Sequence, residues 1–310
     1  MEHLITEIPD SLSKLENFIK AHESAHELKE GAEAQIIWAD SSSIKRTEYA
    51  IVYLHGFRAS HPEGDPVHKA VAQKLGCNLY LSRLAEHGIK SQYPLFNLTE
   101  KSLLKSAHFA FEIGKRIGKK IILMGTSTGG SLALYLASHP EHKDRISSLV
   151  LYSPLIQFFG IKQQLLTSTA IRKLLSIVPG KKHLITNAQS TYAEDRIWNK
   201  KYTLGGVLAL GAFVQHHMRN ELFKQVQQPA FIGYYYKNRK EQDTVVSVQA
   251  IKRMAKKLDS RTAPPQVVNF PNAKNHVICS SLLSKSVENV IDHTSRFLKD
   301  LGTHRTTGTH

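Results

Sequence analysis

Short apolar runs alternate with stretches of helical spacing along most of this chain, and that alternation restricts its fold more than any other feature. The runs are rich in β-branched and aromatic residues and are bounded by polar loops, which predicts strands at 35–38, 49–54, 77–81, 119–124 and 146–152. Apolar residues three and four positions apart predict helices between them at 66–75, 99–118 and 130–138. The central runs are continuously apolar, so we expect an α/β fold with a mostly parallel central sheet and helices on both faces.

The alternation stops after Pro154 and resumes at Pro229 with predicted strands at 229–236 and 266–270 and helices at 246–258 and 284–301. The intervening stretch has helical apolar spacing, with apolar residues that include Phe158, Phe159, Leu165 and Leu166. The predicted organisation is an N-terminal extension (1–33) with an amphipathic helix over 10–29, a core (34–154 and 229–301), a helical cap insertion (155–228) and a disordered tail (302–310).

Composition excludes several classes of protein. Forty-one Lys and Arg against 26 Asp and Glu give a net charge of +15, but the basic residues are scattered in pairs with no nucleic-acid-binding motif, so we expect a solvated basic surface and no nucleic-acid partner. No apolar run approaches the roughly 18 residues that span a bilayer, and the first turns lack a secretory pattern. Two cysteines exclude a disulfide framework and favour the cytoplasm. The oligomeric state is left open.

The most specific motif is Gly125-Thr126-Ser127-Thr128-Gly129, between a predicted strand and a predicted helix. A serine on a sharp strand-to-helix turn presents its hydroxyl to a base from another loop, and the crowded turn needs small residues two positions before and after the serine. We therefore predict that Ser127 is a nucleophile. His55-Gly56-Phe57 ends the strand at 49–54, and we expect the N–H groups of Phe57 and Thr128 to form an oxyanion hole.

The acid and the base are expected after the last two strands. Asp243 follows the strand at 229–236, and His276 follows the strand at 266–270, which gives the chain order nucleophile, acid, base. Glu241 is the competing acid, but Asp243 leads directly into the next predicted helix and is favoured. The predicted catalytic residues are Ser127, Asp243 and His276.

With these motifs the chain resembles the α/β-hydrolases, and most of all their carboxylesterase and monoacylglycerol-lipase-like branch. The similarity covers residues 34–300 and rests on the His-Gly loop, the Gly-x-Ser-x-Gly turn and the helical stretch before the acid strand. Arg83 to Gly88 resembles the Gly-His-Gly segment of that branch, except that Glu86 stands where the first glycine would be. The resemblance implies hydrolysis of a small short- to medium-chain or monoacylglycerol-like ester through an acyl-enzyme on Ser127, with no metal or organic cofactor and no stable membrane insertion. It also implies that the helical insertion roofs an acyl pocket with Phe158, Phe159, Leu165 and Leu166.

Two alternatives remain open from the sequence. His22-Glu23-Ser24-Ala25-His26 matches H-E-x-x-H, which on a helix places two imidazoles one turn apart for zinc and supplies a glutamate base. The zinc metalloprotease that this motif would imply lacks an evident third ligand. The second alternative is a hydrolase-fold protein that binds a ligand or partner without catalysis.

Overall fold

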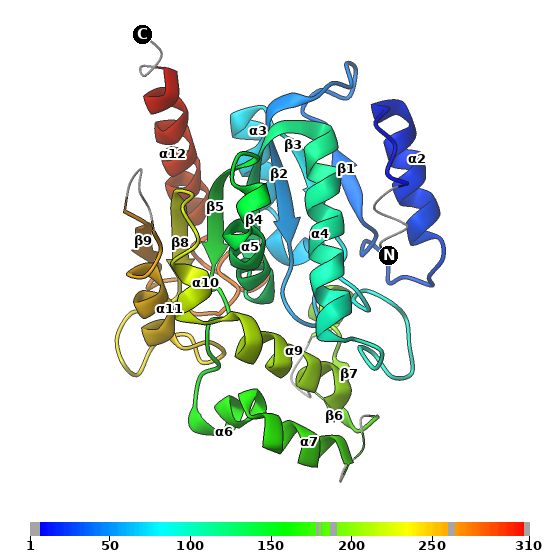
Figure 1. Ribbon diagram of the computed structural model, residues 1–310, viewed down its shortest axis with the longest axis vertical. Helices are drawn as coiled ribbons and strands as arrows, with labels where there is room; N and C mark the ends of the chain where they lie inside the picture. The colour runs from blue at the N-terminus through cyan, green and yellow to red at the C-terminus, as the bar shows by residue number, and fades with distance from the viewer. Residues whose placement is uncertain (1–6, 178–179, 181, 187–190, 260–263, 307–310) are drawn as a thin grey trace.

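The computed structural model describes residues 7–177, 180, 182–186, 191–259 and 264–306. Seven strands form one sheet in the order β1-β3-β2-β4-β5-β8-β9, and β1 is antiparallel to β3 whereas the other neighbouring pairs are parallel (Figure 1). The strands are β1 (Gln35–Ile37), β2 (Thr47–Leu54), β3 (Asn78–Leu81), β4 (Gly118–Thr126), β5 (Ile146–Tyr152), β8 (Ala230–Tyr234) and β9 (Gln266–Asn269). This sheet confirms the predicted α/β class.

Helices cover both faces of the sheet (Figure 1). One face carries α2, α4, α5 and α11, whose buried side chains belong to one core cluster, and the other carries α3 and α12, which pack on each other and on the sheet. The helices are α2 (Leu12–Glu23), α3 (Val67–Leu75), α4 (Glu100–Ile117), α5 (Thr128–Ser138), α11 (Val248–Ala255) and α12 (Val287–Thr306).

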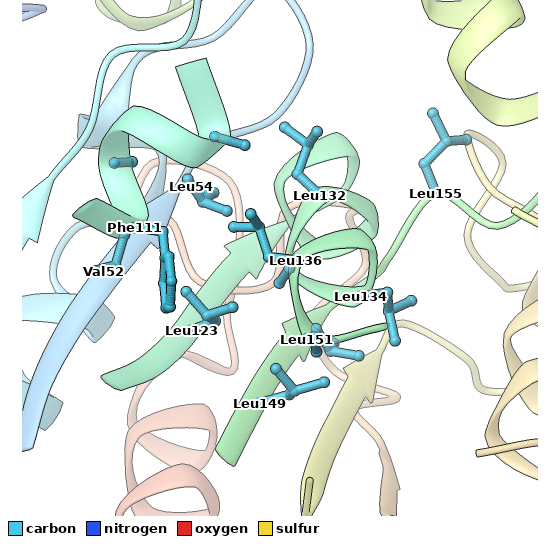
Figure 2. Packing of buried hydrophobic residues seen from close by; sticks show 14 of the residues in the cluster. Val52, Leu54, Phe111, Leu123, Leu132, Leu134, Leu136, Leu149, Leu151 and Leu155 are labelled. Carbon is cyan, nitrogen blue, oxygen red and sulfur yellow. The ribbon is translucent and has the colours of Figure 1, made fainter. Parts of the chain in front are cut away.

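The two central strands hold the core together. Leu123 of β4 and Leu151 of β5 face α4 and α5, where Phe111 and Leu136 pack against them (Figure 2). The alternate residues of the same strands, such as Met124, pack on the opposite face. Strand side chains point to opposite faces in turn, so a strand covered on both sides must be apolar at nearly every position.

The chain between β5 and β8, residues 153–229, forms what we call the β5–β8 segment. Its helices α7 and α9 lie across the end of the sheet to which the strands point (Figure 1). It also contains a two-stranded antiparallel sheet, β6 with β7, in a stretch that was expected to be mostly helical. Three-residue strands are too short to give an alternating pattern, so the spacing could not reveal them. Its elements are α6 (Ile161–Gln164), η3 (Leu165–Thr167), α7 (Thr169–Ile177), β6 (Leu184–Thr186), α8 (Tyr192–Ile197), β7 (Lys201–Thr203), α9 (Leu204–His217) and α10 (Asn220–Phe223).

The first helix is shorter than predicted, because α2 ends at Glu23 and not at Lys29. The Glu23 carboxylate turns inward to a buried ion pair with Arg83 (2.7 Å) and accepts the N–H of Ala34 (2.9 Å). Beyond the helix, the Lys29 ammonium donates to the carbonyl oxygen of Trp198 (3.2 Å). The N-terminal segment is thereby joined both to the loop after β3 and to the β5–β8 segment.

The last helix is longer than predicted. α12 continues to Thr306, so residues 302–306 of the expected disordered tail are helical, and 307–310 lie outside the described residues. Leu298 is buried and Leu301 is partly buried against the core, so packing stabilises the helix close to its end. None of the helices in the described ranges combines the length and the apolar character needed to cross a bilayer.

Candidate active site

Ser127 lies at the turn from β4 into α5 in a conformation that few non-glycine residues adopt. Its φ of 53° and ψ of −116° are held by hydrogen bonds from its N–H to Tyr152 O (2.8 Å) and from Leu155 N to its own carbonyl oxygen (3.1 Å). The turn is too crowded for larger neighbours, because a Cβ on Gly125 would lie 2.4 Å from Gly129 C. Backbone strain of this kind at a buried serine is typical of a nucleophile turn.

Asp243 and His276 come from different loops and lie in contact. The Nδ1 of His276 is 2.6 Å from one Asp243 oxygen, and the other oxygen accepts the N–H groups of Val245 (2.8 Å) and Val246 (3.0 Å). Glu241, the competing acid, points to solvent and pairs with Lys237 (2.9 Å). A fixed, buried carboxylate on Nδ1 makes that nitrogen the N–H donor and leaves Nε2 as the basic atom.

The charge around His276 suits a base. Burial alone would lower the pKa of its imidazole, but the Asp243 carboxylate and the charge of Glu63 outweigh burial and raise that pKa above the ordinary 6.5. Nε2 is buried and has no hydrogen-bond partner among the described residues. The basic nitrogen is therefore free to receive a proton.

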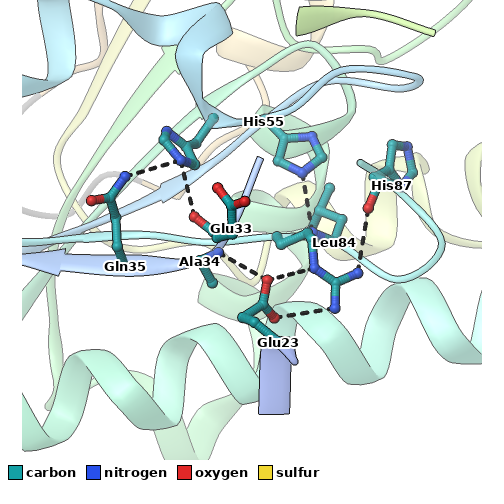
Figure 3. Close-up of polar contacts among 9 residues, drawn as sticks. Glu23, Glu33, Ala34, Gln35, His55, Leu84 and His87 are labelled. Carbon is teal, nitrogen blue, oxygen red and sulfur yellow. Dashed lines mark hydrogen bonds and ion pairs between the residues drawn. The ribbon is translucent and has the colours of Figure 1, made fainter. Parts of the chain in front are cut away.

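The loop after β2 is held in one conformation by its neighbours. His55 Nε2 accepts the N–H of Leu84 (3.1 Å), as Figure 3 shows, so its Nδ1 carries the proton. This Nδ1–H donates to Gly56 O (2.9 Å). Burial lowers the pKa of His55 well below its usual value, so the ring stays neutral. Next to Leu84 in the same loop, Arg83 forms the buried ion pair with Glu23 seen in Figure 3. The His55 ring therefore links the loop after β2 to the loop after β3 through hydrogen bonds and is not available as a base.

Glu86, where the resemblance departs from the Gly-His-Gly pattern, has a φ of 64°. Glycine is favoured in this conformation, so the backbone at Glu86 has the conformation expected of the glycine that stands there in the Gly-His-Gly pattern. The neighbouring His87 is buried with its ring edge against His55 (centroids 5.1 Å apart), and burial lowers its pKa to about 4.

Comparison with known proteins gives matches only at the level of structure. No protein-family model and no curated protein matches the sequence. One of the metagenome-derived lipolytic enzymes LipS and LipT superposes with a TM-score of 0.68 at 15% identity, over 88% of this chain and 100% of that one. A monoglyceride lipase from Saccharomyces cerevisiae has a TM-score of 0.57 at 16% identity, over 87% and 91%. An enol-lactonase from Burkholderia xenovorans has a TM-score of 0.52 at 15% identity, over 88% and 98%.

The chain has the α/β-hydrolase fold. In such a sheet, ligands bind beyond the carboxyl ends of the parallel strands, and here Ser127, Asp243 and His276 all lie after the ends of parallel strands. Along the chain, Ser127 follows β4, Asp243 follows β8 and His276 follows β9.

A cavity of about 420 Å³ opens at Asp243 and His276. The apolar residues expected to roof an acyl pocket lie elsewhere: Phe158 packs in the core and Leu165 is 46% exposed. Other residues line this part of the cavity. Apolar spacing predicts that a side chain is buried but not which residues it contacts, so the sequence could not identify them. The cavity is lined among others by Arg58, Trp198, Tyr235, Lys274 and Leu283.

Glu63 is the residue near the site that the sequence did not indicate. It lies in the short 3-10 helix η1 (His61–Gly64), is 2% exposed, and accepts the N–H of Gly56 (2.6 Å) and the indole N–H of Trp198 (3.1 Å). Burial raises the pKa of its carboxyl to about 7. A glutamate in a Pro-Glu-Gly loop reads as solvated, so the sequence carries no signal for this position.

The residues of the zinc motif have other contacts. Because α2 ends at Glu23, His26 lies beyond the helix and the two histidines are not one helical turn apart. Glu23 is bound to Arg83, and the His22 ring packs on Phe109 with centroids 5.2 Å apart. Within the described ranges no group of three or more His, Cys, Asp or Glu residues is arranged to hold a metal ion.

Proposed function

We propose that this protein is a serine hydrolase that cleaves carboxylic esters through an acyl-enzyme on Ser127. The observation that supports it most is the His276–Asp243 pair, with Nδ1 bound to the carboxylate at 2.6 Å and Nε2 buried without a partner among the described residues. The strained turn at Ser127 and the α/β-hydrolase fold add to it. Several α/β-hydrolases with this architecture bear lipase or esterase names, which favours ester chemistry.

In the proposed mechanism Nε2 of His276 takes the proton from the Ser127 hydroxyl as its oxygen attacks the acyl carbonyl carbon. The N–H groups of Phe57 and Thr128 bind the oxyanion that forms. The C–O bond to the alcohol then breaks, and His276 returns the proton to the departing alkoxide. Water, deprotonated by His276, then attacks the acyl-enzyme carbonyl carbon. The bond from that carbon to the Ser127 oxygen breaks, His276 returns the proton to that oxygen, and the acid leaves. No step needs a cofactor.

We assign residues 155–228, which make up nearly all of the β5–β8 segment, the role of a cap over the site. The side chain of Trp198 lines the cavity at His276, and the backbone near Phe158 forms a bridge to Val246 beside the acid loop. The mixed polar and apolar wall suits a small ester with a short- to medium-chain acyl group or a monoacylglycerol-like substrate. The buried free thiols of Cys77 and Cys279 agree with a cytoplasmic location.

The test is a chain-length series of p-nitrophenyl esters with wild type and Ser127→Ala, together with labelling by a fluorophosphonate. We expect labelling at Ser127 and a loss of turnover of at least about 10³-fold in the alanine variant. Turnover that survives Ser127→Ala and disappears with a chelator would contradict the proposal. A wild-type protein that is neither labelled nor active on any ester would instead support the binding-protein alternative.

A further inference from the structure

Glu63 connects three parts of the site. Its carboxyl oxygens accept hydrogen bonds from Gly56 in the loop after β2 and from Trp198 in the β5–β8 segment. A Cβ built on Gly56 would lie 2.9 Å from a Glu63 oxygen and 3.3 Å from Ser127 Cβ, so the carboxyl group, the glycine and the serine are packed together. A larger residue at position 56 would have to displace the Glu63 carboxyl group.

The contacts of Gly56 determine where the next N–H points. Glu63 holds the N–H of Gly56, and the Gly56 carbonyl oxygen accepts from His55 Nδ1 (2.9 Å) and from Ala59 N (3.3 Å). With both sides of the residue bound, the peptide between Gly56 and Phe57 has one orientation. The N–H of that peptide belongs to Phe57, one of the two proposed oxyanion donors.

Residues 197–199 of the β5–β8 segment lie along the same loop. Arg58 O accepts the N–H of Asn199 (2.7 Å), and the Arg58 guanidinium donates to Asn199 O (3.1 Å). The Ser60 hydroxyl donates to the carbonyl oxygen of Ile197 (3.1 Å). The indole of Trp198, at the centre of this stretch, is the contact that reaches Glu63, so a shift of the segment is transmitted to the loop through Glu63.

The charged and titratable groups that face Glu63 are His276, Arg58, Tyr53 and Cys279. Burial raises the pKa of the Glu63 carboxyl, whereas its N–H donors, His276 and Arg58 favour its ionised form. The interaction is mutual, since the charge of Glu63, with that of Asp243, raises the pKa of His276 against the effect of burial and of Arg58. Glu63 thus affects both the oxyanion loop and the base.

We propose that Glu63 is a positioning residue for catalysis: it links the N–H of Gly56, in the peptide just before the one that carries the Phe57 N–H, to Trp198, so that the oxyanion donor is in place when residues 197–199 are seated on the loop. This inference rests on the proposed hydrolase function and extends it to a residue outside the triad. Glu63 does not contact the reacting atoms in this role; it acts through Gly56.

The test compares Glu63→Gln with Trp198→Phe. Gly56 and Trp198 donate to different oxygens of Glu63, and glutamine has an NH₂ group in place of one of these oxygens, which cannot accept a hydrogen bond. The hydrogen bond that remains lacks the charge that strengthens the original. Loss of one oxyanion donor costs about 10²–10³ in turnover. We expect Glu63→Gln to lower kcat at least about tenfold with KM within about threefold, because the displaced donor acts only on the transition state. Trp198→Phe keeps the Gly56 bond, and its kcat should fall less.

The pH profile separates positioning from a purely structural role. Removal of the Glu63 charge lowers the pKa of His276, so the ascending limb of kcat/KM should move to lower pH in Glu63→Gln and stay in place in Trp198→Phe. Thermal unfolding of each variant checks the fold. Unchanged kcat and an unchanged limb in a folded Glu63→Gln variant would overturn the proposal.

The rate of labelling of Ser127 by a fluorophosphonate gives a readout that needs no substrate. Slower labelling of Glu63→Gln than of wild type supports the clamp. Equal labelling rates overturn the clamp alone and leave the proposed function in place. Absence of labelling at Ser127 in wild type overturns both.

Discussion

Gly129 packs closely against the end of β2, and a substitution there tests whether this packing fixes the nucleophile turn. A Cβ at this position would lie 1.8 Å from Leu54 O, 2.4 Å from Leu54 C and 2.8 Å from His55 O, all of them backbone atoms. Favourable heavy-atom contacts lie at about 3.5–4.0 Å, so Gly129→Ala forces α5 and β2 apart by more than about 1 Å. No side chain can rotate away to relieve the contact.

Two consequences are expected. Overpacking costs about 1–3 kcal/mol where neighbours adjust, and the rigid backbone at this turn places the cost at about 3 kcal/mol or more. For a chain of 310 residues this lowers Tm by at least about 4 °C. A misplacement of about 1 Å at the nucleophile lowers kcat about 10²-fold. Thermal and urea unfolding measure the loss of stability, and ester kinetics measure the loss of kcat.

The matched control is Gly302→Ala in α12, where an added Cβ meets nothing within 4 Å. Alanine favours a helix over glycine by about 1 kcal/mol, so this variant should be unchanged or slightly more stable with wild-type kcat. A Gly129→Ala protein with wild-type Tm and kcat would refute the claim that close backbone packing fixes the nucleophile turn.

The triad, the base and the buried ion pair can be tested separately. Asp243→Asn should lower kcat about 10⁴-fold because the asparagine no longer holds the imidazole in the right tautomer, whereas Glu241→Gln should leave kcat within about twofold; the reverse pattern would move the acid to Glu241. The kcat/KM for an ester should rise with pH through a midpoint above 6.5, because the base must be neutral and the pKa of His276 is raised; a midpoint below 6.5 would contradict this. Arg83→Ala leaves the buried Glu23 charge unpaired and should cost about 3–5 kcal/mol in urea unfolding, while Glu23→Leu with Arg83→Met should cost much less; equal losses would exclude a charge effect.

The sequence predicted the sheet well where local pattern and burial agree. β5 was expected at 146–152 and is found at Ile146–Tyr152, because a strand buried on both faces is apolar throughout and stands out from its polar loops. The prediction failed where a contact distant in sequence decides the structure. α2 ends at Glu23 because that carboxylate pairs with Arg83, 60 residues away, and no local signal marks this end.

The residues of the candidate site also differ in whether the sequence could predict them. Ser127 is marked by two glycines that the turn itself requires, and Asp243 and His276 by their places after strands, so motif and topology together point to them. Glu63 has no such mark. Its importance depends on Trp198, 135 positions later, and only the folded chain brings the two side chains together.

The N-terminal segment has a consequence for anyone who shortens this chain. Residues before the first strand look like a removable extension, yet Glu23 anchors the loop that bears Leu84, and Lys29 binds the backbone of Trp198, whose indole reaches Glu63. A truncation that starts at Ala34 would therefore release two supports of the site in one step, although it deletes no residue of the triad. Affinity tags and fusion partners are better attached at the other terminus, where α12 runs out beyond the sheet (Figure 1).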